Sequence, residues 1–139
     1  MSFGEIYNIA GAGMQAQTIR LNTVASNLAN AGAAAENPDD AFRALKPVFS
    51  TIYNQTQDGK AAGAHVEVAA IVETDAPLDM RYEPDHPFSD EQGYVAYSNV
   101  NTVEEMADMM AASRSFETNV EVMNRARSMQ QGLLQLGNK

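Results

Sequence analysis

The chain has 139 residues, a length typical of a single domain. It carries 18 Asp and Glu against 9 Lys and Arg, a formal net charge of −9, which disfavours binding to nucleic-acid phosphates or to anionic membrane surfaces. Leu, Ile, Val and Phe together number 27, whereas Ala alone numbers 22. A chain with so few large apolar side chains buries little surface by itself, so we expect both of its ends to be disordered until a partner covers them.

The first predicted segment, residues 1–32, is a helix with a recognisable start. Ser2 and Glu5 have the spacing of a capping box, in which each side chain pairs with a backbone N–H of the first turn. Positions spaced three and four apart from Tyr7 to Leu28 then lie on one face, which predicts a helix to about residue 29. We expect Asn30 or Gly32 to end it in the left-handed conformation.

The middle segment, residues 33–100, is acidic and has strand patterns. It carries twelve acidic and four basic residues. Residues 47–54 are rich in β-branched and aromatic side chains, residues 66–73 alternate between two faces, and residues 94–97 follow a glycine. Asp58 and Gly59 are typical of a turn. The pattern predicts a small β-rich module of three or four strands.

The last segment, residues 101–139, is predicted to be a long helix ending near residue 136. Thr102 and Glu105 have the spacing of a second capping box. One face of this helix has residues at alternating steps of three and four: Met106, Met109, Ser113, Phe116, Val120, Met123, Arg127, Gln130 and Leu134. A seam of this kind needs a partner helix. We therefore expect an α+β fold, in which the two terminal helices pack as a coiled-coil-like pair or bundle beside the β-rich middle.

Catalytic and metal-binding patterns are weak in this sequence. There is no cysteine, and His65 and His86 lack the spacing of metal ligands. The acidic cluster Asp85, Asp90 and Glu91 lacks the spacing of a calcium loop, and we expect it to be a solvated surface. We expect no enzyme activity and no cofactor. No apolar stretch is long enough for direct membrane insertion.

Three segments carry a family resemblance. Residues 20–31 (RLNTVASNLANA) and 99–136 resemble the terminal signatures of flagellar rod and hook proteins, and residues 82–101 (YEPDHPFSDEQGYVAYSNVN) resemble the short proximal rod proteins among them. Phe116 stands where that family mostly has Tyr, and Thr118 stands where Ala is usual.

The resemblance implies a structural role. Such proteins leave the cell through the flagellar type III export apparatus without a cleaved signal peptide, and they polymerise in the periplasm into the rod of the basal body. The implied partners are other rod proteins and the junction between rod and membrane ring, with no nucleic acid. The alternative that the residues leave open is a helical adaptor or chaperone that holds one partner helix in a closed complex.

The helical ends supply the candidate assembly interface. We expect it to comprise Leu21, Val24, Asn27, Leu28, Asn30, Met106, Met109, Met110, Phe116, Val120, Met123, Met129, Leu133 and Leu134. Asn27 and Asn30 can either hydrogen-bond beyond the helix or only stop it locally.

Overall fold

The computed structural model describes residues 2–55 and 61–137, and it has two long helices and two small sheets. The helices are α1 (Phe3–Ala29) and α2 (Thr102–Gly137). Between them come β1 (Ala34–Ala35), the short 3-10 helix η1 (Pro38–Asp40), β2 (Leu45–Gln55), β3 (Ala61–Glu73), β4 (Asp79–Tyr82) and β5 (Tyr94–Tyr97). The α+β class predicted from the sequence is confirmed. The turn predicted at residues 58–59 lies outside the described residues.

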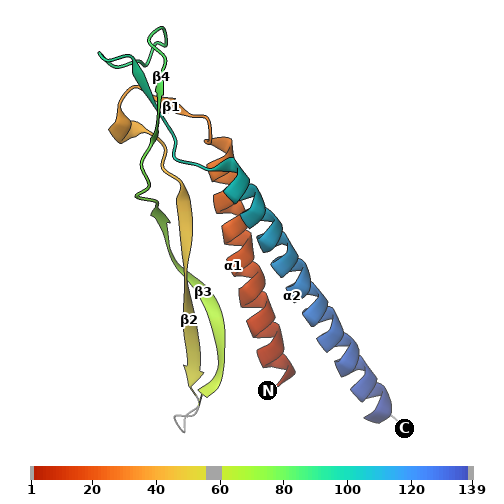
Figure 1. Ribbon diagram of the computed structural model, residues 1–139. Helices are drawn as coiled ribbons and strands as arrows, with labels where there is room; N and C mark the ends of the chain where they lie inside the picture. Colours follow the sequence, from red (N-terminus) through yellow and green to blue (C-terminus); the bar gives the residue numbers. More distant parts are fainter. Residues whose placement is uncertain (1, 56–60, 138–139) are drawn as a thin grey trace.

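Helix α1 lies between the other two long elements. Figure 1 shows the β2–β3 ribbon on one side of α1 and α2 on the other, and α1 contacts all three of these elements. The two helices run antiparallel, so both chain ends lie at the same end of the molecule. With 36 residues against 27, α2 is about 13 Å longer than α1 at ~1.5 Å per residue, and it extends past the start of α1.

The strands form two separate antiparallel sheets. β2 and β3 make a two-stranded ribbon, and β5 is the middle strand of a three-stranded sheet in the order β1-β5-β4. A register shift between Val48 and Phe49 leaves Ala69 as an extra residue in β3. Such a bulge shifts the alternation of faces, so Ile71 rather than Val72 lines the hollow that the ribbon forms with α1.

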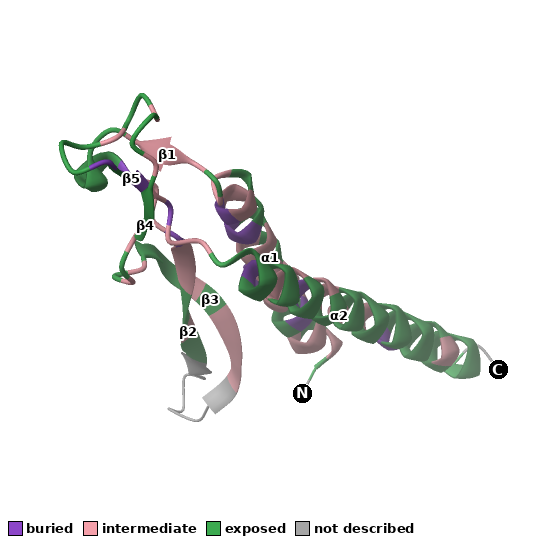
Figure 2. Ribbon diagram, turned by 45° about the horizontal axis from the view of Figure 1, so that its top comes forward, coloured by how far each residue is buried: buried purple, intermediate pink, exposed green. Residues whose placement is uncertain are grey.

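The core of the described residues consists of small side chains. Nine apolar residues are buried, and seven of them are alanines, at positions 10, 16, 41, 44, 96, 112 and 126; the other two are Val24 and Val95. Figure 2 shows these buried positions as short stretches within elements that are otherwise intermediate or exposed. Small side chains let elements approach closely but contribute little transfer free energy each. Polar contacts must therefore carry an unusual share of the specificity of this fold.

The helix ends follow the sequence in part. At α1, Ser2 and Glu5 form the predicted capping box, which is confirmed. At α2 the predicted box of Thr102 and Glu105 is wrong. Asn101 caps this helix, because its side-chain oxygen accepts hydrogen bonds from the backbone N–H groups of Val103 and Glu104. Asn accepts such bonds at least as well as Thr. The Glu105 side chain pairs with Lys46 of β2 instead.

The predicted left-handed residue after α1 is also wrong. Asn30 has φ −107°, and among the described residues only Gly63 and Gly93 have positive φ. Helix α1 ends instead through hydrogen bonds from the backbone N–H of Asn30 to carbonyls of the last turn and from its side chain to the carbonyl of Ser26. The helix end therefore does not depend on Gly32.

Two glycine substitutions test this. Gly93 has φ +82°, and a Cβ there would lie 2.9 Å from Cε2 of Tyr82, whereas a Cβ on Gly32 would meet no atom within 4 Å. We expect Gly93→Val to lower the free energy of unfolding by about 1–2 kcal/mol or more, because a β-branched residue resists this φ, and Gly32→Val to change it by less than about 0.5 kcal/mol. Urea denaturation of both variants is the measurement. Equal loss in the two would contradict this account of the helix end.

Candidate assembly interface

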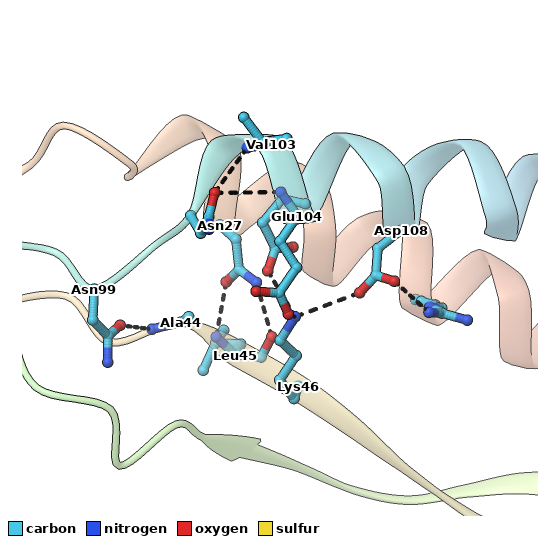
Figure 3. A network of polar contacts seen from close by, with 11 residues as sticks. Asn27, Ala44, Leu45, Lys46, Asn99, Val103, Glu104 and Asp108 are labelled. Carbon is cyan, nitrogen blue, oxygen red and sulfur yellow. Dashed lines mark hydrogen bonds and ion pairs between the residues drawn. The ribbon is translucent and has the colours of Figure 1, made fainter.

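A network of polar side chains joins the two helices to the ribbon (Figure 3). Asn27 is fully buried, and its amide pairs twice with the backbone of Leu45: Nδ2 donates to the carbonyl at 2.8 Å, and Oδ1 accepts from the N–H at 2.8 Å. This geometry imitates a neighbouring strand at the outer edge of β2. Of the two roles that the sequence left open for Asn27, the long-range hydrogen bond is present, while Asn30 makes the local stop.

A second asparagine, at the other end of the middle segment, belongs to the same network. Asn99 Oδ1 accepts from the backbone N–H of Ala44 at 2.7 Å, and its Nδ2 donates to the carbonyls of Thr74 and Ala76. Where the chain enters and leaves the ribbon, its backbone N–H and carbonyl groups therefore hydrogen-bond to side chains. Sequence reasoning did not identify Asn99 as important.

Charged side chains form the third part of the network. The Lys46 ammonium lies 3.0 Å from Oε1 of Glu105, 3.3 Å from Glu104 and 3.4 Å from Asp108. Arg20 of α1 approaches the other oxygen of Asp108 at 2.6 Å. These pairs connect β2 to α2 and α1 to α2. We define Asn27, Lys46, Asn99 and Glu105 with the backbone groups they bind as the junction.

Glu105 is the most constrained acid of the junction. Its side chain is 2% exposed, and Oε2 has no hydrogen-bond partner among the described residues. Burial acts to lower the pKa of Lys46, but the hydrogen bonds and negative charges of Glu105 and Glu104 outweigh it, so this pKa is raised above that of an ordinary lysine. Three acids at positions 104, 105 and 108 surround this one ammonium group, and their grouping in the first turns of α2 is a sequence signal for a basic partner.

The seam between the helices differs from the predicted one at every second position. Met109, Phe116 and Met123, which are predicted to lie on it, are half-buried. The buried positions beside them are Ala112 and Ala126, not Ser113 and Arg127. The close approach is visible at Gly13 of α1, where a Cβ would come within 2.9 Å of Asn119 Nδ2. The helices pack through small residues, which a search for large apolar side chains overlooks.

The predicted interface residues fall into three groups by burial. Val24 and Asn27 are buried inside the chain. Half-buried residues are Leu21, Leu28, Asn30, Met109, Phe116 and Met123. Exposed residues are Met106, Met110, Val120, Met129, Leu133 and Leu134. The chain's own fold thus uses the first group completely and leaves the surface of the third group uncovered.

The uncovered apolar side chains of α2 form two stripes. Val103, Met106 and Met110, spaced three and four apart, are 58–74% exposed near its start. Met129, Leu133 and Leu136, also spaced four and three apart, are 56–73% exposed where α2 extends past α1. Contiguous exposed apolar surface marks an interaction site in soluble proteins. We call these the proximal stripe and the distal stripe.

The hollow between α1 and β3 has both apolar and polar walls. It has a volume of about 280 Å³ and is lined by Ala12, Gln15, Ala16 and Ile19 of α1 and by residues 65–68 of β3, which include His65 and Glu67. No group of three or more His, Cys, Asp or Glu in the described residues could hold a metal ion. No described helix is long and apolar enough to cross a membrane.

Comparison with known protein families matches both helical ends. Residues 8–32 match the family described as flagella basal body rod protein, and residues 91–136 match flagellar basal body rod FlgEFG protein C-terminal. An antiparallel pair of terminal helices with these two sequences defines a structural rod protein of the bacterial flagellum.

Similarity to curated proteins extends over nearly the whole length. The chain is 42% identical to the flagellar basal-body rod protein FlgC of Salmonella typhimurium and to that of Escherichia coli O157:H7, over 99% of each chain. It is 35% identical to FlgC of Borreliella burgdorferi over 88% of this chain and 89% of the relative. The chain therefore belongs to the FlgC family of flagellar basal-body rod proteins. It is a structural component of the rod and not an enzyme.

Proposed function

We propose that this rod subunit joins its neighbours through the proximal and distal stripes of α2, and that the resulting polymer acts as the torque-transmitting drive shaft. The observation that carries the proposal is the extension of α2 past α1, where Leu133, Leu134 and Leu136 are 56–73% exposed. Isolated in water, such a helix end is unstable. From the family we infer that helices of neighbouring rod proteins pack against these leucines.

The finer location and route are part of the same proposal. We infer that the subunit passes through the type III export apparatus without a cleaved signal peptide and assembles in the periplasm. There it contacts other rod proteins near the point where the rod meets the membrane ring. The junction of Asn27, Lys46, Asn99 and Glu105 supports the interface from inside, because it fixes how the ribbon sits against the helices. Val24 and Asn27 contribute to assembly in this indirect way.

A substitution in the distal stripe tests the proposal. We expect Leu133→Asp to leave expression and secretion intact but to abolish rod assembly and swimming, because a charge buried without a partner costs several kcal/mol. Gln131→Asp is the matched control, because it adds the same charge at an exposed polar position two residues away. The Gln131→Asp strain should swim normally. Met123 is unsuitable, since it lies on the seam with α1 and its replacement would also damage the monomer.

Analytical ultracentrifugation of the protein mixed with its rod neighbours separates the two functional classes. A rod subunit gives open-ended assemblies that grow with concentration, whereas an adaptor or chaperone gives a closed complex of fixed mass. Normal rods in the Leu133→Asp strain would show that the distal stripe is not an assembly contact.

A further inference from the structure

One face of the three-stranded sheet has exposed aromatic side chains beside the buried Ala96. Residues directly opposite in neighbouring strands lie on the same face, so the pairs Tyr82 with Tyr94 and Met80 with Ala96 place Met80, Tyr82 and Tyr94 together. These three side chains are 45%, 65% and 41% exposed. The rings of Tyr82 and Tyr94 meet edge to face with centroids 5.4 Å apart. We call this the tyrosine face.

Contacts within the sheet and its turn orient the tyrosine face. The ring of Tyr82 lies against the backbone of Gly93, where any Cβ would be only 2.9 Å away. Asp90 Oδ1 accepts hydrogen bonds from the backbone N–H groups of Gln92 and Tyr94, both at 2.8 Å, so Asp90 shapes the turn before β5 and is not merely solvated as we had expected. Rigid, amphipathic tyrosines are typical anchors of protein interfaces, since they lose little conformational entropy on binding.

The surroundings of the tyrosine face are acidic. The segment 82–101 contains Asp85, Asp90 and Glu91 and no Lys or Arg; its fourth acid, Glu83, pairs with Tyr97 on the opposite face. Asp85 and Glu91 are exposed, and neither forms an ion pair within residues 2–55 and 61–137. A surface that combines open aromatic rings with negative charge is complementary to a cation beside apolar groups.

On the opposite face of the same sheet, a cation already lies against an aromatic ring beside a carboxylate. There Arg81 lies 4.5 Å from the centroid of the Tyr97 ring and pairs with Asp79 at 2.8 Å. The Tyr97 hydroxyl donates to Glu83 at 2.9 Å, and this hydrogen bond to a carboxylate raises the pKa of the phenol. Within the described residues, Arg81 is the one cation that stacks on a ring, so the tyrosine face has the rings and the acids without the arginine.

We propose that the tyrosine face docks a basic surface of a neighbouring protein, with an arginine or lysine of that protein against the ring of Tyr82 and the acids at 85 and 91 around it. This contact is distinct from the α2 stripes: it lies on the sheet, at the end of the molecule opposite the distal stripe (Figure 1). It rests on the proposed rod function only in that the neighbour belongs to the assembled structure.

Substitutions at Tyr82 test the ring. Tyr82→Ala should reduce the yield of basal bodies at least tenfold, whereas Tyr82→Phe, which keeps the ring, should stay within twofold of the parent. Tyr53 on β2 is equally exposed, 68% against 65%, so Tyr53→Ala is the matched control for loss of an exposed tyrosine. Circular dichroism of the purified Tyr82→Ala variant verifies that the fold is intact.

Charge and partner are tested in the same strains. The double variant Asp85→Lys with Glu91→Lys should lose assembly, whereas the single changes Asp85→Asn and Glu91→Gln should have little effect because other acids remain. A benzophenone amino acid at position 82 should cross-link in isolated basal bodies to a peptide that carries Arg or Lys beside the linked residue. A link to Arg114, Arg125 or Arg127 of a second copy would support the same chemistry and identify that copy as the partner.

The proposal is overturned if Tyr82→Ala assembles as well as Tyr82→Phe, if no cross-link forms at position 82, or if the linked peptide has no basic residue. Its failure is separate from failure of the rod function. Rods that depend on Leu133 but not on Tyr82 would retain the proposed function and remove this contact alone.

Discussion

Replacing Asn27 with alanine is expected to lower the free energy of unfolding by about 2–4 kcal/mol. The side chain is fully buried, and its amide makes both hydrogen bonds available to the outward-facing backbone of Leu45, each at 2.8 Å. Alanine removes two hydrogen bonds and leaves a buried N–H and a buried carbonyl unpaired, which costs more than the bonds themselves contribute. Urea denaturation followed by circular dichroism gives the change.

Asn30 provides the comparison for this experiment. It is the same residue type three positions later, but its side chain bonds only to the carbonyl of Ser26 in its own helix. We expect Asn30→Ala to cost about 1 kcal/mol or less, as is usual for a single local hydrogen bond. Equal losses in the two variants would mean that the pairing of Asn27 with β2 does not stabilise the protein.

The second large effect is expected at Lys46. We predict that Lys46→Met destabilises the protein by about 2–3 kcal/mol, because it leaves the buried carboxylate of Glu105 without its counter-charge. The figure is below that for a fully buried pair, since the Lys46 side chain is 34% exposed and water screens part of the interaction. The measurement is again the free energy of unfolding.

A double variant distinguishes a lost pair from lost packing. Lys46→Met combined with Glu105→Leu should recover most of the stability, because an apolar pair of similar volume avoids the cost of burying charge. If the double variant is as unstable as the sum of the single changes, the ion pair is not the cause. In that case the pairs of Lys46 with Glu104 and Asp108 would be the important ones.

The pH dependence of this pair has a definite sign. The pKa of Lys46 is raised in the folded state, so its contribution is fully present below the ordinary lysine value and is lost as pH rises through the folded value. The Lys46 contribution should therefore be constant across neutral pH and fall only in strongly alkaline solution. Comparing parent and Lys46→Met in an alkaline unfolding series measures it, since the two curves should converge there.

Local patterns predicted the elements whose cause is local. The capping box of Ser2 and Glu5, the end of α1 near residue 29 and the strand at residues 94–97 are confirmed, because each depends on a few neighbouring residues. β1 and β4 were not predicted individually. β1 is two alanines, and β4 lies between prolines; both are strands only because β5 offers them an edge on each side.

The junction could not be predicted, because its hydrogen bonds and ion pairs join residues that lie far apart in the sequence. Asn27 and Leu45 are 18 residues apart, Ala44 and Asn99 are 55 apart, and Lys46 and Glu105 are 59 apart. Periodicity within one segment gives no information on such pairs. It also starts from large apolar residues such as Val120, and its steps of three and four then lead to Arg127, whereas Ala126 is the buried residue.

The central position of α1 has a consequence for the order in which the chain can fold. Each long element that packs on α1 follows it in the sequence, and its ion pair with α2 spans 88 residues. Synthesis delivers α1 first, yet its partners arrive only when most of the chain has been made, and contacts of such long separation form slowly. The chain therefore has an interval without stable tertiary structure, which suits a protein proposed to thread through an export channel before it assembles.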